Sequence, residues 1–292
     1  MDRLVFLTVD GLSRGAVYAT MALALVLIWR GARIVNFAQG AMAVAAAYVA
    51  HSVTAATGSF WLGFAAAIAA GPALGWLVER LVMRHVGHDR PLNAVIVALG
   101  LVLLITAVLG IVYGNEFRPA PAAFDRTALQ LGGVPLLSPY DVFVFGTVAV
   151  TVGALALLFT RSRVGLRLRA SAFAPEVSRL LGVNVSGMLL LGWVLAAGVG
   201  ALAGMLIIPT EFGLHPNAMD RSFVVAFTAA VVGGLDSPAG AVIGGLAVGL
   251  VLSFVGGYLG DQVTPLAIIV LLLAVLLIRT DGLFATPAAR RI

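Results

Sequence analysis

The chain of 292 residues contains neither cysteine nor lysine. Without cysteine it cannot form a disulfide framework, a thiolate metal site or a cysteine nucleophile. Without lysine it cannot form a P-loop, because the G-x-x-x-x-G-K-[ST] motif places a lysine on the phosphates of ATP. If this protein depends on ATP, a separate subunit must bind the nucleotide.

Charged residues are also scarce. They make up 11% of the chain, against 61% hydrophobic residues, and the mean hydropathy is +1.07. So little polar surface cannot cover a soluble globule, which predicts an integral membrane protein in contact with lipid. The formal net charge of +5 rests on arginine alone, and no basic soluble surface with interleaved aromatic residues suggests a nucleic-acid partner. Residues 1–15 carry charges and no small-residue cleavage site, so we expect no removable signal peptide.

Catalytic and metal-binding patterns are missing too. All 13 acids and all four histidines lie in loops or near the ends of apolar stretches. His85 and His88 are three residues apart but lack cysteine or acidic partners at ligand spacing, so we expect a solvated turn there. No mid-span histidine pair could hold haem, and no G-x-S-x-G or H-E-x-x-H motif occurs. The sequence therefore predicts neither an enzyme nor a resident metal or cofactor.

Long apolar stretches dominate what remains, and about 20 helical residues span a hydrocarbon core of roughly 30 Å. We expect an all-α fold: a polytopic transmembrane bundle of about 8–10 spans, broken or re-entrant helices included, in one domain over residues 1–292. The stretch 222–235 is too short to cross unaided and runs into GGLDSPAG, where glycines and Pro238 favour a broken hairpin. The candidate spans lie at about 11–29, 34–54, 59–78, 91–113, 140–160, 187–209, 222–235, 238–258 and 263–279.

The orientation follows from the arginines, which are retained on the cytoplasmic side. With the arginine-rich segment 161–186 inside, simple alternation places 13 of the 18 arginines inside and five outside. This predicts an external N-terminus, a cytoplasmic C-terminus and an ordered external loop at about 114–139. If 222–235 did not cross, the C-terminus would move outside.

Two helix breaks on the proposed cytoplasmic side resemble each other. A Gly-Ala pair occurs at the same place in both, 200 residues apart, in FAQGAMAVAAAYVA (37–50) and SPAGAVIGGLAVGL (237–250). The two stretches are either structural counterparts in an internal repeat or similar by chance, because both are rich in alanine and glycine. Unpaired backbone groups at the breaks must be satisfied by protein or water, so the breaks are candidate polar elements of a path. The alternative is that their glycines only permit close helix packing. The candidate residues are Asn36, Phe37, Gln39, Gly40, Gly233, Gly234, Leu235, Asp236, Ser237 and Gly240.

The segment RSRVGLRLRASAFAPEVSRLLGV (161–183) holds five arginines. At about 2.5 to 3.5 kcal/mol for each arginine at the bilayer centre, they would cost more than about 10 kcal/mol, so the segment lies outside the hydrocarbon. Pro175 suits the first position of a helix, Glu176 favours its positive N-terminal end, and Gly182 suits the left-handed residue after it. The sequence therefore predicts a cytoplasmic helix of about two turns.

One face of this short helix is apolar, because Val177, Leu180 and Leu181 fall at spacings of three and four. A helix of two turns is not stable alone in water and must dock on something. The partner is either the lipid headgroup surface, helped by the flanking arginines, or a groove on a soluble protein. Physical reasoning leaves these two alternatives nearly equal.

Three stretches resemble permease subunits of branched-chain amino acid ABC importers. The first stretch, residues 161–184, reads RSRVGLRLRASAFAPEVSRLLGVN. It is similar to the cytoplasmic loop of these permeases, whose pattern is R-x-R-x-G-x-x-x-R-A-x-A, followed further on by A-x-L-L-G-I-N. Residues 11–50 resemble the first helix pair with its I-N-F-A-H-G motif, and residues 227–250 resemble F-T-A-A-V-L-G-G-I-G-S-x-x-G-A-x-x-G-G. The matches occur in order over most of the chain, and the short N-terminus resembles the first of the two paralogous permeases.

The resemblance implies an importer in the bacterial inner membrane, built from this chain, a second paralogous permease, two ATPases and an external solute-binding protein. The alternative to the paralogous permease is a second copy of this chain. It implies no cofactor in this chain, since ATP and Mg bind to the ATPases. It also implies that 161–186 is the coupling loop, whose ATPase contacts are Arg169, Ala170, Glu176, Val177, Leu180, Leu181 and Gly182. The implied substrates are branched-chain or related amino acids. The alternatives are a related ABC importer for urea, amides or aromatic acids, or a standalone secondary transporter.

Three positions depart from the family pattern. Gln39 replaces the usual histidine, Ala41 replaces a frequent acid, and residues 173–175 replace a more acidic run. The family's imidazole at position 39 and acid at position 41 are therefore absent near the first break, and we expect their absence to change which substrate is transported. The coupling helix should persist, because Pro175 is tolerated at a helix start.

Overall fold

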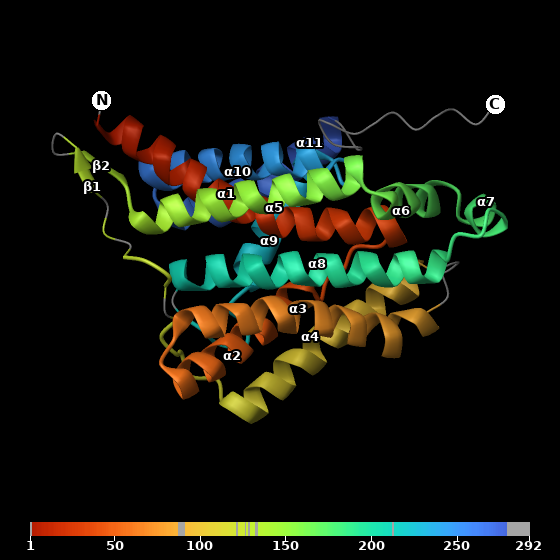
Figure 1. The fold of residues 1–292 in the computed structure, drawn as a ribbon. Helices are drawn as coiled ribbons and strands as arrows, with labels where there is room; N and C mark the ends of the chain where they lie inside the picture. Colours follow the sequence, from red (N-terminus) through yellow and green to blue (C-terminus); the bar gives the residue numbers. More distant parts are fainter. Residues whose placement is uncertain are drawn as a thin grey trace.

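The computed structural model describes residues 2–86, 91–120, 122–125, 127, 129–131, 134–211 and 213–278. In this part the fold is all-helical apart from one short hairpin, which confirms the predicted fold class (Figure 1). The helices are α1 (Asp2–Ala32), α2 (Gln39–Thr57), α3 (Phe60–Leu81), α4 (Pro91–Tyr113), α5 (Pro139–Arg161), α6 (Arg163–Phe173), α7 (Pro175–Leu180), α8 (Val185–Ile207), α9 (Asp220–Gly233), α10 (Pro238–Leu259) and α11 (Thr264–Ile278). Strands β1 (Leu129–Leu131) and β2 (Val134–Leu137) pair antiparallel within the predicted external loop.

Eight of the described helical segments are long and apolar enough to cross a membrane. They match eight of the nine predicted stretches. The ninth stretch, 222–235, is the 14-residue helix α9, which at 1.5 Å per residue covers only about 21 Å. Gly234, with φ +94°, ends α9, and Ser237 begins α10, so the two helices form the hairpin expected from GGLDSPAG.

A close antiparallel crossing of α1 and α10 forms the centre of the bundle. A Cβ atom on Gly249 would lie 2.3 Å from the Gly15 Cα, and one on Gly245 would lie 2.5 Å from the Ala19 Cα. Only small residues allow two helix backbones to approach this closely. Ser253 adds a polar contact on the same face, because its hydroxyl donates to the Leu7 carbonyl oxygen at 2.8 Å.

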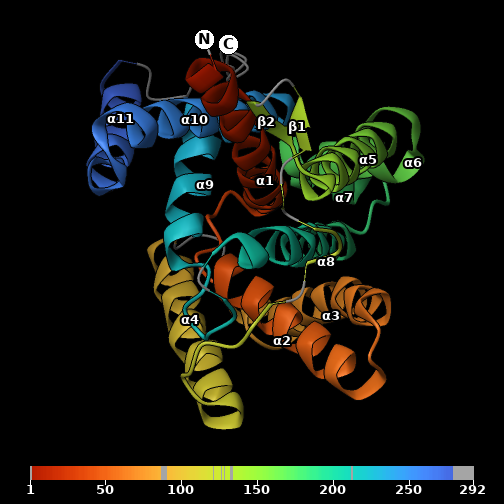
Figure 2. The ribbon, with the colours of Figure 1, turned by 90° about the vertical axis from the view of Figure 1, so that its left-hand side faces the viewer.

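A second close contact joins α3 to α8, which lies between α1 on one side and α2 and α3 on the other (Figures 1 and 2). A Cβ on Gly71 would lie 2.6 Å from the Ala197 carbonyl oxygen, and one on Gly75 would lie 2.5 Å from that of Trp193. The peripheral helices α4, α5 and α11 expose leucine, isoleucine and valine side chains outward, as expected for surfaces in contact with lipid or another subunit.

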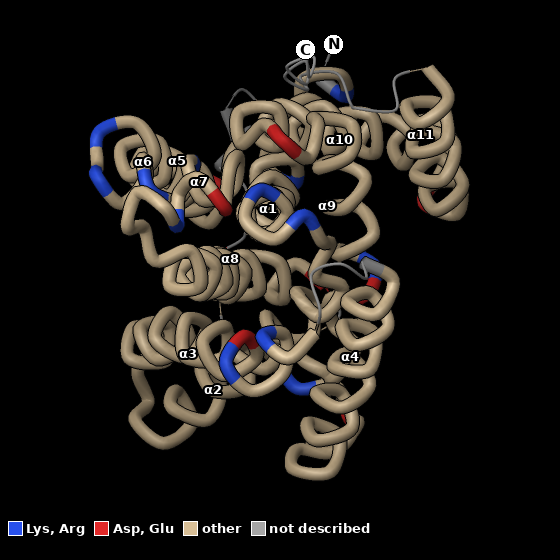
Figure 3. Tube along the Cα trace, turned by 90° about the vertical axis from the view of Figure 1, so that its right-hand side faces the viewer, with Lys and Arg blue, Asp and Glu red and all other residues tan. Residues whose placement is uncertain are grey.

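The two ends of the bundle differ in the elements they carry. We call the end with α6 and α7 the α7 end, and the opposite end, with β1 and β2, the hairpin end (Figure 1). Viewed from the α7 end, arginines mark the ends of α1 and α3 and the α6–α7 segment (Figure 3). His85 closes a short 3-10 turn at this end, whereas His88 lies outside the described residues.

Candidate coupling helix and translocation elements

Helix α7 has the bounds predicted from the sequence. Pro175 is its first residue, and Gly182, with φ +78°, follows its end in the left-handed region. The Gly182 N–H donates to the Arg179 carbonyl at 3.0 Å, and the Val183 N–H donates to that of Ser178 at 2.9 Å. This pair of bonds is the Schellman motif, which satisfies two carbonyls that the helix end would otherwise leave free. The short helix is therefore well defined at both ends.

The apolar face of α7 points away from the bundle. Ser178 is buried against the protein, whereas Val177, Leu180 and Leu181 are 55%, 88% and 78% exposed. Phe173, the last residue of α6 and four positions before Val177, is 82% exposed as well. We call these four side chains the α7 apolar patch. The sequence pattern identified the first three but missed Phe173, whose position depends on how α6 meets α7.

The predicted contact residues outside this patch lie on the same segment. Glu176 and Gly182 are exposed on α7 and just after it, while Arg169 is exposed and Ala170 half-buried on α6. Helix α6 begins directly after α5, where the Ser162 hydroxyl accepts from the Gly165 N–H at 2.9 Å. A Cβ on Gly165 would lie 2.1 Å from the Leu158 carbonyl oxygen, so the α5–α6 turn is tight. This tight turn and the packing of α6 against α1 and α8 give α7 a firm attachment to the bundle.

The first break, residues 33–38, is held by a buried amide pair. The Asn36 side-chain amide donates to the Gln39 side-chain oxygen at 3.0 Å, and its oxygen accepts from the Ala38 N–H at 3.1 Å. Gln39 then donates to the Ala196 carbonyl of α8 at 2.9 Å. Gly200 makes room for this contact, since a Cβ there would lie 1.9 Å from the Gln39 nitrogen. Protein groups therefore satisfy polar atoms at this break and fix it to α8.

An aromatic cluster lies beside the same break. The Phe37 ring is 6.2 Å, centroid to centroid, from the rings of Phe223 and Phe227 on α9. Gly40 packs against the same helix, because a Cβ there would be 3.5 Å from the Phe223 Cβ. The start of α2 is therefore fitted against α9 as well as α8.

The second break, residues 234–237, meets the first at the α7 end. Arg33, whose φ is +56°, pairs with Asp236 at 2.5 Å. The α9–α10 hairpin is closed by Gly233 and Gly240, since a Cβ on Gly233 would lie 2.0 Å from the Gly240 carbonyl oxygen. The Arg33–Asp236 pair thus links the two breaks, whereas Gly233, Ser237 and Gly240 lie together within the α9–α10 hairpin and Asn36 and Gln39 face α8. The proposed repeat that relates 37–50 to 237–250 stays a prediction.

A polar cavity of about 560 Å³ opens at the hairpin end among α1, α5 and the segment between α8 and α9. In its wall Arg14 pairs with Asp10 at 2.9 Å, and Glu211, also in the wall, accepts a hydrogen bond from the Ser222 hydroxyl at 2.7 Å. The Ser13 hydroxyl donates to Asp141. Sequence reasoning missed this cavity, although the i, i+4 spacing of Asp10 and Arg14 signals a charged face on the first helix. No group of three or more metal-ligating side chains occurs among the described residues.

The comparisons with known proteins agree with this architecture. Residues 7–279 match the family described as "Branched-chain amino acid transport system / permease component". The chain belongs to this family. It is therefore a multi-pass membrane protein and a non-catalytic permease subunit of ABC transport, in which a separate ATPase and a binding protein are the implied partners.

Individual relatives of the permease cover nearly its whole length. The high-affinity branched-chain amino acid transport system permease protein LivH of Escherichia coli (strain K12) is 27% identical over 297 residues, which is 97% of this chain and 96% of LivH. BraD of Pseudomonas aeruginosa has the same identity and coverage. The ribose import permease protein RbsC of Escherichia coli is 26% identical over 249 residues, 83% of this chain and 74% of RbsC. No solved structure matches the permease.

Proposed function

We propose that this permease pairs with a second, paralogous permease and two ATPases, and imports branched-chain or related amino acids delivered by an external solute-binding protein. The observation that carries the proposal is the α7 apolar patch, which is exposed at the end of the bundle where the two breaks meet. Three of its four side chains belong to a helix that begins at Pro175 and ends in a Schellman motif. An unpartnered apolar helix face suits a groove on a soluble subunit. The likeness to LivH and BraD over nearly the full length supports the substrate class.

In this proposal residues 161–186 form the coupling loop within one permease domain over residues 1–292. Closure of the ATPase pair around ATP and Mg moves α7, and the tight α5–α6 turn passes the movement to α5 and to the end of α1. The end of α1 leads into the first break, which is joined to the second by Arg33 and Asp236. A shift at this end therefore acts on both breaks together, which suits a change between outward and inward access.

We infer that the permease lies in the bacterial inner membrane with the α7 end in the cytoplasm, the N-terminus outside and the C-terminus inside. The arginine count supports this orientation, since 13 of 18 arginines fall on the inner side. The path of the chain supports it too: α9 ends beside Arg33 and Asp236 at the α7 end, so α9 with the segment before it completes a crossing. The arginines at 90, 126, 279, 290 and 291 lie outside the described residues.

The orientation can be tested by labelling, because the chain has no cysteine of its own. Thr57, exposed at the end of α2, and Arg179, exposed on α7, lie at opposite ends of the bundle. In intact spheroplasts a membrane-impermeant maleimide should label Thr57→Cys, whereas Arg179→Cys should react only after the membrane is opened. The reverse pattern would invert the proposed topology. The unsubstituted chain, which has no thiol, is the background control.

Reconstitution tests the function itself. The permease pair, the ATPases and the binding protein, placed in liposomes, should take up radiolabelled leucine only when ATP is supplied to the ATPase side. ATP-dependent uptake of urea, amides or aromatic acids in place of leucine would favour the related importers. Uptake by this chain alone, without ATP or partner subunits, would contradict the proposal and indicate a secondary transporter.

A further inference from the structure

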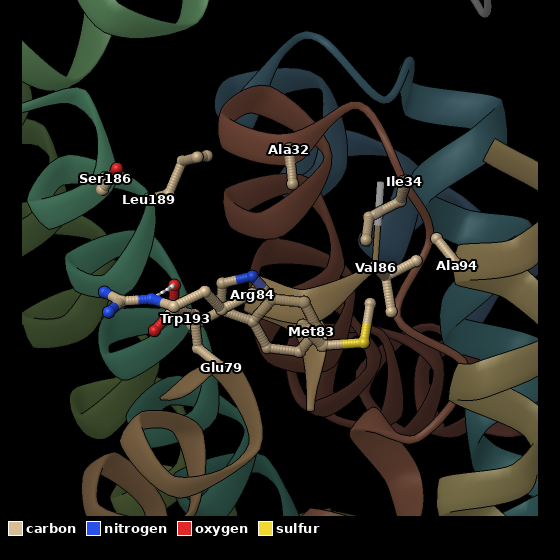
Figure 4. Close-up of a pocket in the computed structure, with 10 residues that line it drawn as sticks. All are labelled: Ala32, Ile34, Glu79, Met83, Arg84, Val86, Ala94, Ser186, Leu189 and Trp193. Atoms are coloured by element: carbon tan, nitrogen blue, oxygen red, sulfur yellow. Dashed lines mark ion pairs between the residues drawn. The ribbon is translucent and has the colours of Figure 1, made fainter. Parts of the chain in front are cut away.

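A second, smaller cavity of about 140 Å³ lies at the α7 end among α1, α3, α4 and α8 (Figure 4). Most of its wall is apolar, with Ile34, Met83, Leu189 and Trp193 among the lining side chains. Glu79 and Arg84 lie together on one side of the view, and Ile34, Val86 and Ala94 lie on the other. The cavity is separate from the α7 apolar patch and from the polar cavity at the hairpin end.

Glu79 is the unusual residue of this cavity. Its side chain is buried, with the residue only 5% exposed, and one carboxylate oxygen has no hydrogen-bond partner among the described residues. The other oxygen is 3.7 Å from the Arg84 Nε, which is beyond hydrogen-bond distance. Buried charges in proteins are ordinarily paired and hydrogen-bonded. Among the described residues, Glu79 therefore has one carboxylate oxygen buried without a hydrogen-bond partner, and its other oxygen, on the side of Arg84, has no hydrogen bond to that residue and can accept one from a ligand.

Arg84 supplies the opposite charge at the same place. It approaches Glu79 through Nε, and its side chain is 35% exposed. A guanidinium carries five N–H donors and binds carboxylates through two parallel bonds. The wall thus offers an acceptor for an ammonium group and donors for a carboxylate, side by side.

The apolar part of the cavity sets the size of the remaining group. An apolar protein cavity of about 150 Å³ holds a benzene molecule. The whole cavity, at about 140 Å³, is of similar volume, so a branched aliphatic side chain of four carbons fits against Ile34, Met83 and Leu189. The polar end of such a ligand would lie at the side of Glu79 and the partly exposed Arg84. The chemistry that satisfies all three features is a zwitterion with an aliphatic tail.

We propose that this cavity is a binding site, facing the cytoplasmic side, for an aliphatic amino acid. Glu79 binds the ammonium group, Arg84 binds the carboxylate, and the apolar wall holds the side chain. The proposal rests on the proposed function for the substrate class and for the side of the membrane. Ala32 and Ile34 belong to the end of α1 and to the first break, so a movement of that break would reshape this site.

The test is equilibrium binding of radiolabelled leucine to the purified permease–ATPase complex, without nucleotide and without the solute-binding protein. The complex is held in nanodiscs of phosphatidylcholine, with a parallel set that contains phosphatidylethanolamine, because that headgroup is also a zwitterion. Wild type should show a saturable site, and Glu79→Gln should weaken leucine binding at least tenfold. Ala94→Leu, which fills the apolar side without touching Glu79, should abolish the same site.

Analogues separate direct binding from a structural role of Glu79. 4-Methylpentanoate lacks the ammonium group, so it should compete poorly with leucine on wild type. We call the ratio of an analogue's inhibition constant to the leucine Kd the preference over that analogue. Glu79→Gln should lower the preference over 4-methylpentanoate at least fivefold. Arg84→Gln should narrow the preference over 3-methylbutylamine, which lacks the carboxylate. The matched control is Arg80→Gln, since Arg80 is exposed on the same helix end and does not line the cavity. It should leave both preferences unchanged.

Three results would overturn the site. The first is the absence of saturable leucine binding in wild type. The second is an unchanged preference over 4-methylpentanoate in Glu79→Gln. The third is the loss of leucine binding in the discs that contain phosphatidylethanolamine, which would assign the cavity to lipid. ATP-driven leucine uptake by the same preparation, with the binding protein added, reports on the proposed function separately. Uptake without this binding refutes only the site, whereas the absence of any leucine uptake refutes the proposed function.

Discussion

Replacing Leu180 and Leu181 together by aspartate should release the ATPases from the purified importer and abolish ATP-driven uptake. The two side chains are 88% and 78% exposed, so within the permease the substitutions should change the free energy of unfolding by less than about 0.5 kcal/mol. We expect these two side chains to be the anchors of the interface, and truncation of such a hot-spot side chain costs about 2 kcal/mol or more. Two such losses, about 4 kcal/mol, correspond to roughly a thousandfold weaker association. Burying two carboxylates in the groove would weaken it further.

The measurement is the yield of ATPase that co-purifies with tagged permease, together with leucine uptake in liposomes. Leu166→Asp is the control, because Leu166 is exposed on α6 in the same segment but does not belong to the α7 apolar patch. It should leave ATPase recovery close to that of wild type. Recovery of the ATPases at full yield with the double variant would assign the patch to the lipid headgroups instead.

The structure of α7 was predictable because its determinants are local. Pro175 fixes the first helical residue and Gly182 takes the left-handed conformation after it, both within one short segment. The direction of Leu180 and Leu181 follows from helical spacing alone. The exposure of Phe173 does not, since it depends on the angle between α6 and α7, which packing against the ends of α1 and α8 determines.

The long-range contacts of the two breaks were not predictable in the same way. The Arg33–Asp236 ion pair and the Gln39–Ala196 hydrogen bond join residues more than about 150 positions apart, and helix packing alone determines which side chains meet. The first helix illustrates the same limit. The apolar pattern predicted a span at 11–29, whereas α1 extends over Asp2–Ala32. Asp10 and Arg14 lie within the helix and face the polar cavity at the hairpin end.

Glu79 is a case in which the sequence held a signal that was missed. The predicted span 59–78 ends one residue before Glu79, which counts among the acids near the ends of apolar stretches. Yet α3 has a small, buried residue at every fourth position, namely Gly63, Ala67, Gly71 and Gly75. Glu79 is the next residue in this series of four. Because residues four apart share a helix face, the small-residue face that packs on α8 also carries Glu79 inward. Its burial was therefore predictable, but the cavity beside it was not.

Substituting Gly249 by leucine should prevent the permease from accumulating as a folded protein. A Cβ at this position would lie 2.3 Å from the Gly15 Cα and 2.5 Å from the Gly11 carbonyl oxygen, and both are backbone atoms of α1 that no rotamer change can move. Overpacking of a core costs typically about 1–3 kcal/mol when side chains can adjust. Here the backbones themselves must separate, so we expect a loss above about 4 kcal/mol, in the range reserved for disrupted packing. The measurement is the yield of monodisperse permease and its thermal unfolding midpoint.

Gly153→Leu provides the matched control, since Gly153 lies on α5 with no atom within 4 Å of its added Cβ. It makes the same change of residue in a helix at the periphery of the bundle, and it should fold at a yield close to wild type. Gly249→Ala should fall between the two, because one methyl group still meets the Gly15 Cα. If Gly249→Leu instead purified like Gly153→Leu, with an unchanged midpoint, α1 and α10 would not cross through this face. The attachment of the first break to the rest of the bundle would then rest on its own contacts, those of Gln39, Arg33 and Phe37.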